Sequence, residues 1–346
     1  MADDPVNGFL MRRPYWVIAV LAWAIAVVKS GVLLVDPPVS ALASFPAPED
    51  RLTGTSYGLR LIAWLLRTES VTGYLIISAT LTLAAILVIS WALRVRLSDA
   101  ESRVAILLVA TASIGTVLLG NVGRNDVLVI MGAALLGLLG RSWAWALAGV
   151  ALMSIGNPEQ AVLATTAYVL CCTTPSLRAR TRPAFAGLAV SVAWALATTA
   201  WARSSGSSGR LGYFFDYLGN SLYHFGHDWP LSLYAAYGTL WILVGLAAVR
   251  TSGWHRVALI AGAVIIPLAV TATTLDQTRV FVGVAAASAF AIIAEFLPQF
   301  TGLLARHRLP AVTVALGAAV LLPSIEIDFH GAVRPAYEWL FTVISG

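Results

Sequence analysis

The sequence predicts an all-α protein, a transmembrane helix bundle of about eleven spans within a range of ten to twelve. Of the 346 residues, 59% are hydrophobic and only 11% are charged, and the mean hydropathy is +0.82. A soluble globular chain is about 45–50% apolar and about 25% charged. Charged side chains this scarce cannot cover a water-facing surface. The composition therefore indicates a multi-pass membrane protein that forms one transmembrane domain over residues 1–346.

Apolar runs along the chain give the count of spans, because a membrane-crossing helix needs about 20 mainly apolar residues. The first run exceeds the roughly 7–15 apolar residues of a signal peptide, so we expect it to be retained as a helix. Residues 331–346 are a twelfth, partial candidate. The eleven runs are Tyr15–Val35, Tyr74–Leu93, Val104–Gly120, Val127–Gly140, Trp143–Ile155, Ala161–Cys172, Ala184–Trp201, Leu231–Val249, Val257–Leu275, Val280–Leu297 and Ala311–Ile325.

Basic residues predict the orientation, since cytoplasmic loops are enriched in Lys and Arg. With a cytoplasmic N-terminus, thirteen arginines fall on the inner side and eight on the outer side. Twelve of the seventeen acidic residues then fall outside. Acidic residues hardly affect topology, so their position reflects either solvation of long outer loops or chemistry on the outer face. We expect a protein of the cytoplasmic (inner) membrane with its active face outward.

The first long outer loop, residues 36–73, contains three candidate catalytic carboxylates: Asp36, Glu49 and Asp50. Two prolines follow Asp36 and end the preceding helix there. Residues 56–67 have apolar side chains at helical spacing, which predicts a short amphipathic helix lying in the membrane interface. The alternative is a loop helix that only packs on the bundle.

Lys29 is the only lysine and lies within the first apolar run. Asp36 follows seven residues later, close to two helical turns, and so lies on nearly the same helix face. Lys29 could therefore reach a carboxylate or a lipid phosphate, or it could simply extend its ammonium group toward water.

Three tight outer turns carry further candidate binding residues. Each alone is compatible with a structural turn, but together they predict a polar cleft that opens outward. In such a cleft an arginine could hold an anionic headgroup, because a guanidinium matches phosphate geometry with two parallel hydrogen bonds. The turn residues are Arg124, Asn125 and Asp126; Asn157, Glu159 and Gln160; and Asp276 and Arg279.

The second long outer loop, residues 202–230, begins with a Ser/Gly-rich linker and continues with an aromatic segment that contains Tyr213. Aromatic residues suit the membrane interface, and they would also stack on a sugar ring or a polyprenyl tail. His224 and His227 match a metal site only weakly. A histidine that binds phosphate or acts as a general acid is favoured, so the sequence predicts no metal site.

This order of elements resembles the integral-membrane GT-C-type glycosyltransferases, in a bacterial branch. In that family the first outer loop carries interfacial helices and the catalytic carboxylate, and a second large outer loop follows the seventh span. The resemblance covers residues 1–230 as a GT-C-like core, with outer loops 36–73 and 202–230, and residues 231–346 would be additional C-terminal spans. The turns around Arg124, Asn157 and Asp276 look like outer-turn motifs of such proteins.

The resemblance implies an inverting glycosyltransferase that moves a sugar from a polyprenyl-phosphate-linked donor to a cell-envelope glycan or lipid acceptor on the outer face. It implies Asp36, then Asp50, then Glu49 as the general base. Arg124 and Arg279, with Lys29 or His224, would hold the lipid phosphate. It implies no resident cofactor, because the lipid-linked sugar is itself a substrate, and it leaves a divalent metal open.

Other functions remain compatible with the sequence. One is a transporter or flippase of a lipid-linked or anionic solute, although no internal repeat relates the two halves as in many transporters. A glycan polymerase or ligase, or a structural partner subunit, is also open. Membrane lipids are expected partners. Nucleic acid is not, because the basic residues are spread singly rather than forming a stripe.

Overall fold

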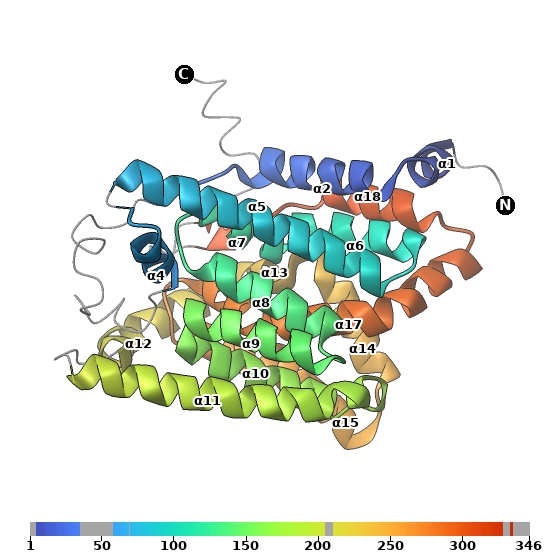
Figure 1. Ribbon diagram of the computed structural model, residues 1–346. Coiled ribbons are helices and arrows are strands. Elements are labelled where there is room, and N and C mark those ends of the chain that lie inside the picture. The colour runs from blue at the N-terminus through green and yellow to red at the C-terminus, as the bar shows by residue number, and fades with distance from the viewer. Residues whose placement is uncertain (1–4, 35–57, 69, 205–209, 328–332, 335–346) are drawn as a thin grey trace.

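The computed structural model describes residues 5–34, 58–68, 70–204, 210–327 and 333–334, and these are almost entirely helical (Figure 1). Most helices lie side by side and run between two ends of the bundle. In chain order they are α1 (Pro5–Arg12), α2 (Tyr15–Ser30), α4 (Gly58–Leu65), α5 (Val71–Arg96), α6 (Asp99–Thr111), α7 (Ser113–Gly120), α8 (Asp126–Leu139), α9 (Trp143–Gly156), α10 (Pro158–Cys172), η1 (Pro175–Arg180), α11 (Thr181–Ser204), α12 (Arg210–His227), α13 (Trp229–Tyr237), η2 (Gly238–Leu240), α14 (Trp241–Arg250), α15 (Gly253–Ile260), η3 (Ala261–Ile265), α16 (Ile266–Ala272), α17 (Gln277–Arg306) and α18 (Ala311–Leu321).

Two short strands complete the elements. β1 (Glu326–Ile327) pairs antiparallel with β2 (Val333–Arg334). We call the end of the bundle where α4 lies and where α5, α8 and α17 begin the Asp276 end. The opposite end, where α5 meets α6 and α14 meets α15, we call the Glu295 end.

Within the described residues, each predicted apolar run coincides with a helix or a consecutive set of helices, which confirms the all-α fold. Several of these helices are apolar enough to suggest a membrane protein. The prediction of eleven spans is not confirmed. Within the described residues, five helical segments are long and apolar enough to cross a membrane, or six if the bent pair α6–α7 is one span. Helices α8 and α9 have 14 residues each and rise only about 21 Å. That is less than the roughly 30 Å of a bilayer core. The five segments are 71–96, 175–204, 229–250, 253–272 and 277–306.

Helix α17 is the central helix of the bundle. Its most apolar 18-residue window is 89% buried, whereas the corresponding window of the segment containing α11 is only 22% buried. Packing against α8, α10, α14 and α16 surrounds it. Its middle third is rich in alanine, so neighbouring helices approach closely on all sides. The two ends of α17 therefore set the position of side chains at both ends of the bundle.

The break between α6 and α7 has a local cause. The two helices are bent by 53°, and Ala112 between them is extended. A Cβ atom on Gly115 would lie 1.8 Å from the carbonyl oxygen of Ala110, so this approach requires glycine. Ser324 donates to the carbonyl of Thr111 at 2.9 Å and so pairs one of the carbonyl groups freed by the break.

The described part of the first long loop forms α4, within the predicted helix at residues 56–67. Leu59 and Ala63 are buried, and Trp64 and Leu65 are 52% and 62% exposed. The buried side packs on α5 and α9. The carboxylates predicted as the base, Asp36, Glu49 and Asp50, lie outside the described residues.

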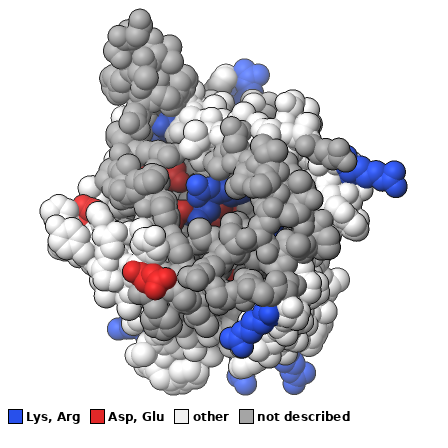
Figure 2. Space-filling model, turned by 90° about the vertical axis from the view of Figure 1, so that its left-hand side faces the viewer, with Lys and Arg blue, Asp and Glu red and all other residues white. Residues whose placement is uncertain are grey.

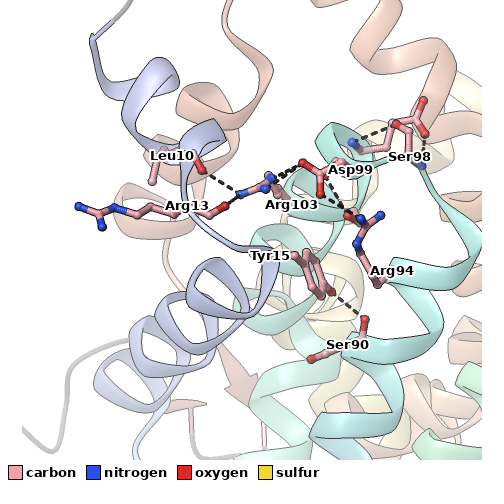
Figure 3. A network of polar contacts seen from close by, with 10 residues as sticks. Leu10, Arg13, Tyr15, Ser90, Arg94, Ser98, Asp99 and Arg103 are labelled. Atoms are coloured by element: carbon pink, nitrogen blue, oxygen red, sulfur yellow. Dashed lines mark hydrogen bonds and ion pairs between the residues drawn. The ribbon is translucent and has the colours of Figure 1, made fainter.

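A polar network fixes the start of the chain at the Glu295 end (Figure 3). Arg103 of α6 donates to the carbonyl oxygens of Leu10 at 2.8 Å and Arg13 at 2.7 Å, and it pairs with Asp99 at 2.8 Å. Tyr15 donates to the carbonyl of Ser90 at 2.7 Å. These contacts join the α1–α2 turn to α5 and α6.

Candidate functional site

Two of the three predicted polar turns meet at the Asp276 end. Arg124 pairs with Asp276 at 3.1 Å, and Arg279 pairs with the same Asp276 oxygen at 2.7 Å and with Asp126 at 3.5 Å. Basic and acidic atoms lie together near the centre of this face (Figure 2). The turn before α8 and the start of α17 therefore share one ionic cluster, although more than 150 residues separate them in sequence.

Glu326 is a member of this cluster that the sequence analysis did not single out. It lies on β1, is 5% exposed, and accepts a hydrogen bond from Asn121 at 2.8 Å. A Cβ on Gly120 would lie 2.7 Å from its carboxylate, so glycine leaves room for it. Its negative charge stabilises the protonated guanidinium groups of both Arg124 and Arg279. The only sequence signal was an acidic residue in an otherwise apolar segment.

The cluster is buried on its acidic side and partly open on its basic side. Asp126 and Asp276 are buried, whereas the side chains of Arg124 and Arg279 are 34% and 25% exposed. Burial, followed by the neighbouring Arg279, lowers the pKa of Arg124, but an arginine remains protonated in proteins. Among the described residues the cluster thus sets two guanidinium groups against three carboxyl groups.

The turn that carries Arg124 is held by its neighbours on two sides. The side chain of Asn125 accepts a hydrogen bond from the backbone of Leu59 in α4 at 2.8 Å. Tyr74 of α5 donates to the carbonyl of Gly123 at 2.8 Å, where φ is +111° and favours glycine. These contacts fix Arg124 relative to α4 and α5.

The beginning of α17 is tied to β1 and to α13. The hydroxyl of Thr278 accepts from the backbone of Ile327 at 2.8 Å, which positions the strand that carries Glu326. Ser232 of α13 donates to the side chain of Gln277. Arg279 therefore projects from a helix start that is anchored on both sides.

The third predicted turn contributes one side chain near the cluster. Asn157 caps α10 by accepting from the backbone of Gln160 at 3.2 Å, and Glu159 lies in the first turn of that helix. Gln160 lies against Gly283, where a Cβ would be 2.6 Å from its Oε1 atom. Gly283 is four residues after Arg279 and so on the same face of α17. The Gln160 Oε1 atom is buried without a hydrogen-bond partner in the described part of the chain.

The remaining predicted binding residues lie elsewhere. Lys29 is buried and donates to the carbonyl oxygens of Ala319, at 2.7 Å, and of Leu322, so it caps the end of α18. His227 stacks on Tyr223 within α12, with ring centroids 6.2 Å apart. His224 also lies on α12. The side chain of Tyr213, on the same helix α12, lies outside the described residues. In the parts of the chain that the structure describes, no three His, Cys, Asp or Glu side chains form a group suited to a metal ion.

Comparison with known proteins identifies no relative: no family model, curated protein or solved structure matches this chain.

Proposed function

We propose that this protein is a membrane glycosyltransferase that uses a polyprenyl-phosphate-linked sugar, and that the cluster at the Asp276 end binds the donor phosphate. The observation that carries the proposal is the pair of partly exposed arginines, Arg124 and Arg279, held side by side by one buried Asp276. Guanidinium groups bind phosphate oxygens with directed, charge-assisted hydrogen bonds. Orientation by a buried carboxylate removes much of the entropy cost of positioning them.

The charge of the cluster requires a proton to accompany the donor. A polyprenyl-phosphate sugar is a phosphodiester and brings one negative charge to a group of two guanidinium and three carboxyl groups. Burial raises the pKa of Asp126, so we propose this carboxyl group as the one that takes up the proton. A protonated Asp126 leaves Arg279 to pair with Asp276 and with the incoming phosphate.

In the proposed reaction, an acceptor hydroxyl oxygen bonds to the anomeric carbon of the donor sugar. The bond from that carbon to the phosphate oxygen breaks, and the lipid phosphate leaves with the electron pair. The hydroxyl proton passes to a carboxylate within hydrogen-bond reach. Asp276 is occupied by two arginines, so we keep Asp36, Asp50 and Glu49 of the first loop as the expected bases, in that order. Arg124 and Arg279 stabilise the charge that grows on the phosphate.

The proposed location follows from the arginine distribution. More arginines lie toward the Glu295 end, so the Asp276 end faces outward if the chain obeys the positive-inside rule. Donors of this type are lipid-carried and available on the outer side of the cytoplasmic membrane. The acceptor is proposed to be a glycan or lipid of the cell envelope.

Binding and transfer can be measured on the full chain in nanodiscs with a radiolabelled polyprenyl-phosphate hexose. We expect Arg124→Gln and Arg279→Gln to weaken donor binding by about tenfold or more, the loss of one charge-assisted hydrogen bond. The matched control is Arg306→Gln, an exposed arginine at the end of α17. Equal binding by wild type and both cluster variants would contradict the proposal.

A transporter of lipid-linked or anionic solutes is the second candidate, favoured by one observation. Transporters often build their sites from interrupted helices, and α6–α7 is bent by 53°. However, Ser113 at the break donates to the carbonyl of Ala236 at 2.6 Å, so neighbouring helices already satisfy groups at the break. Movement of the labelled lipid between leaflets without sugar transfer would favour the transporter.

A further inference from the structure

A cavity of about 240 Å³ lies at the Glu295 end, far from the ionic cluster at Asp276. It is bounded by η1, by the turn between α14 and α15, and by α17. Its polar lining comes from Ser176, Arg250, Thr251, Ser252, His255 and Gln299. The cavity therefore gathers hydrogen-bond donors from three separate elements.

The acidic residue of α17 that lies closest in sequence to the cavity-lining Gln299 is Glu295, and its negative charge is already compensated by arginines. Glu295, one turn before Gln299, accepts at a single oxygen from Arg96 at 2.6 Å, Arg141 at 2.8 Å and Arg180 at 3.2 Å. Three positive charges on one carboxylate leave an excess of positive charge beside the cavity. This excess favours an anion rather than a cation.

The sequence around the cavity adds further positive charge. Neither the stretch between Glu159 and Asp216 nor the stretch between Asp228 and Asp276 contains an acidic residue. The first stretch supplies η1 and the second supplies the α14–α15 turn, and both are rich in arginine. In or next to η1 lie Arg178, Arg180 and Arg182, and at the α14–α15 turn lie Arg250 and Arg256.

Two groups that line the cavity have no partner in the described part of the protein. Arg250 makes no ion pair there, and the Nδ1 atom of His255 is buried without a hydrogen-bond partner. Ser252 precedes α15, and its side chain makes no capping hydrogen bond. Of these groups only the His255 Nδ1 atom is buried, whereas Arg250 and Ser252 are exposed. An unpaired buried polar atom is costly, and an anion in the cavity would give His255 Nδ1 a partner and face the guanidinium group of Arg250.

The cavity borders the apolar surface of the bundle. Trp254 is 62% exposed and lies against His255, with ring centroids 4.0 Å apart. Val249 and Val257 on either side are 74% and 66% exposed. Exposed tryptophan beside basic residues is typical of the boundary between lipid tails and headgroups.

We propose that this cavity binds the phosphate group of an anionic phospholipid, with Arg250 and His255 as its principal ligands. Basic pockets between helices at a membrane surface recognise lipid phosphates in this way. Free inorganic phosphate has the same chemistry and is distinguished by the experiment. The site does not depend on the function proposed for the Asp276 end.

The test uses the full chain in nanodiscs of phosphatidylcholine, with or without phosphatidylglycerol, and in neutral detergent with inorganic phosphate. Retained lipid is counted by native mass spectrometry, and Tm is measured for each condition. We expect phosphatidylglycerol to be retained and to raise Tm in the wild type, and Arg250→Gln and His255→Asn to weaken retention about tenfold each. In phosphatidylcholine alone Arg250→Gln should keep the wild-type Tm, because Arg250 has no ion pair among the described residues.

Arg306→Gln is the matched control, since Arg306 is exposed near the same end and does not line the cavity. A rise in Tm with inorganic phosphate alone, abolished by Arg250→Gln, would assign the site to free phosphate instead of lipid. If neither probe distinguishes wild type from Arg250→Gln, or if Arg306→Gln loses as much lipid, the proposal is wrong.

Discussion

Asp276, directly before α17, and Glu295 within α17 lie near opposite ends of the bundle, about 28 Å apart at 1.5 Å per residue. This separation is close to the roughly 30 Å thickness of a bilayer core. Residues 280–294 between them contain no charge. Asp276 pairs with Arg124 from the turn before α8 and with Arg279 of α17 itself. Glu295 pairs with Arg96, Arg141 and Arg180, all from other elements. The central helix thus joins the rest of the bundle through ion pairs at both ends.

The contact between Arg180 and Glu295 should stabilise the fold. Arg180 is fully buried and also donates to the carbonyl oxygen of Gly137. We expect Arg180→Gln to lower the free energy of unfolding by about 1–3 kcal/mol, because it leaves the buried carbonyl oxygen of Gly137 without its charged donor, while Glu295 keeps Arg96 and Arg141. Thermal unfolding in detergent measures the change. Arg178→Gln, an exposed arginine on the same 3₁₀ helix, should leave Tm within error, and an equal loss in both variants would contradict the assignment.

Close packing of α8 on α9 depends on two glycines. A Cβ on Gly132 would lie 2.3 Å from the carbonyl oxygen of Gly149, and a Cβ on Gly149 would lie 2.5 Å from that of Gly132. Small residues of this kind let membrane helices approach closely. We expect Gly132→Ala to lower stability by about 1–3 kcal/mol through overpacking. Gly245→Ala is the control, since its Cβ would meet no atom within 4 Å, and its Tm should not fall.

Much of the helical architecture could be predicted from sequence, because long apolar runs leave few alternatives to a helix. The number of crossings could not. The close approach of Gly115 to the backbone of Ala110 accommodates the bend between α6 and α7. The short helix α8 is buried by tertiary packing, whereas α9 buries only one side. Local hydropathy does not distinguish a short buried helix from a span.

The candidate site was predictable only in part. The turns containing Arg124 and Asp276 were recognised as polar and were expected on one face, but their direct ion pair depends on the packing of α8 against α17. Glu326 was missed because it joins the cluster through β1, a strand too short to leave a pattern. Lys29 was a candidate for binding the substrate phosphate, with extension of its ammonium group toward water as the alternative. Its observed hydrogen bonds are instead to the backbone carbonyl groups of Ala319 and Leu322 at the end of α18.

Those hydrogen bonds lead to a prediction for Lys29. A charged donor to buried carbonyl groups contributes about 1.5–3 kcal/mol, so Lys29→Met should destabilise the protein by a similar amount, and Lys29→Arg should recover part of it. Donor binding should be unchanged once the variant is folded, because Lys29 contacts α18 rather than the Asp276 cluster. Tm and binding of the labelled donor are measured on the same preparation. A variant with normal Tm that no longer binds donor would restore the substrate role.

Donor binding should depend on pH through Asp126. Burial raises the pKa of this carboxyl group, so its neutral form is populated at a higher pH than for an ordinary aspartate. Protonation removes one negative charge beside Arg279, whereas the phosphodiester of the donor stays ionised. Affinity should therefore rise as the pH falls through the pKa of Asp126, and decline as the pH rises above it.

The variant Asp126→Asn separates this effect from other titrations. It mimics the neutral carboxyl group, so we expect tight donor binding that no longer changes with pH. Asp276→Asn is the contrasting variant: it also removes one negative charge, but it releases both arginines from the carboxylate that orients them, and binding should weaken at every pH. Equilibrium binding of the labelled donor from mildly acidic to mildly alkaline pH distinguishes these cases. If Asp126→Asn retains the wild-type pH dependence, the proton is taken up by another group, and Glu326→Gln is the next variant to measure.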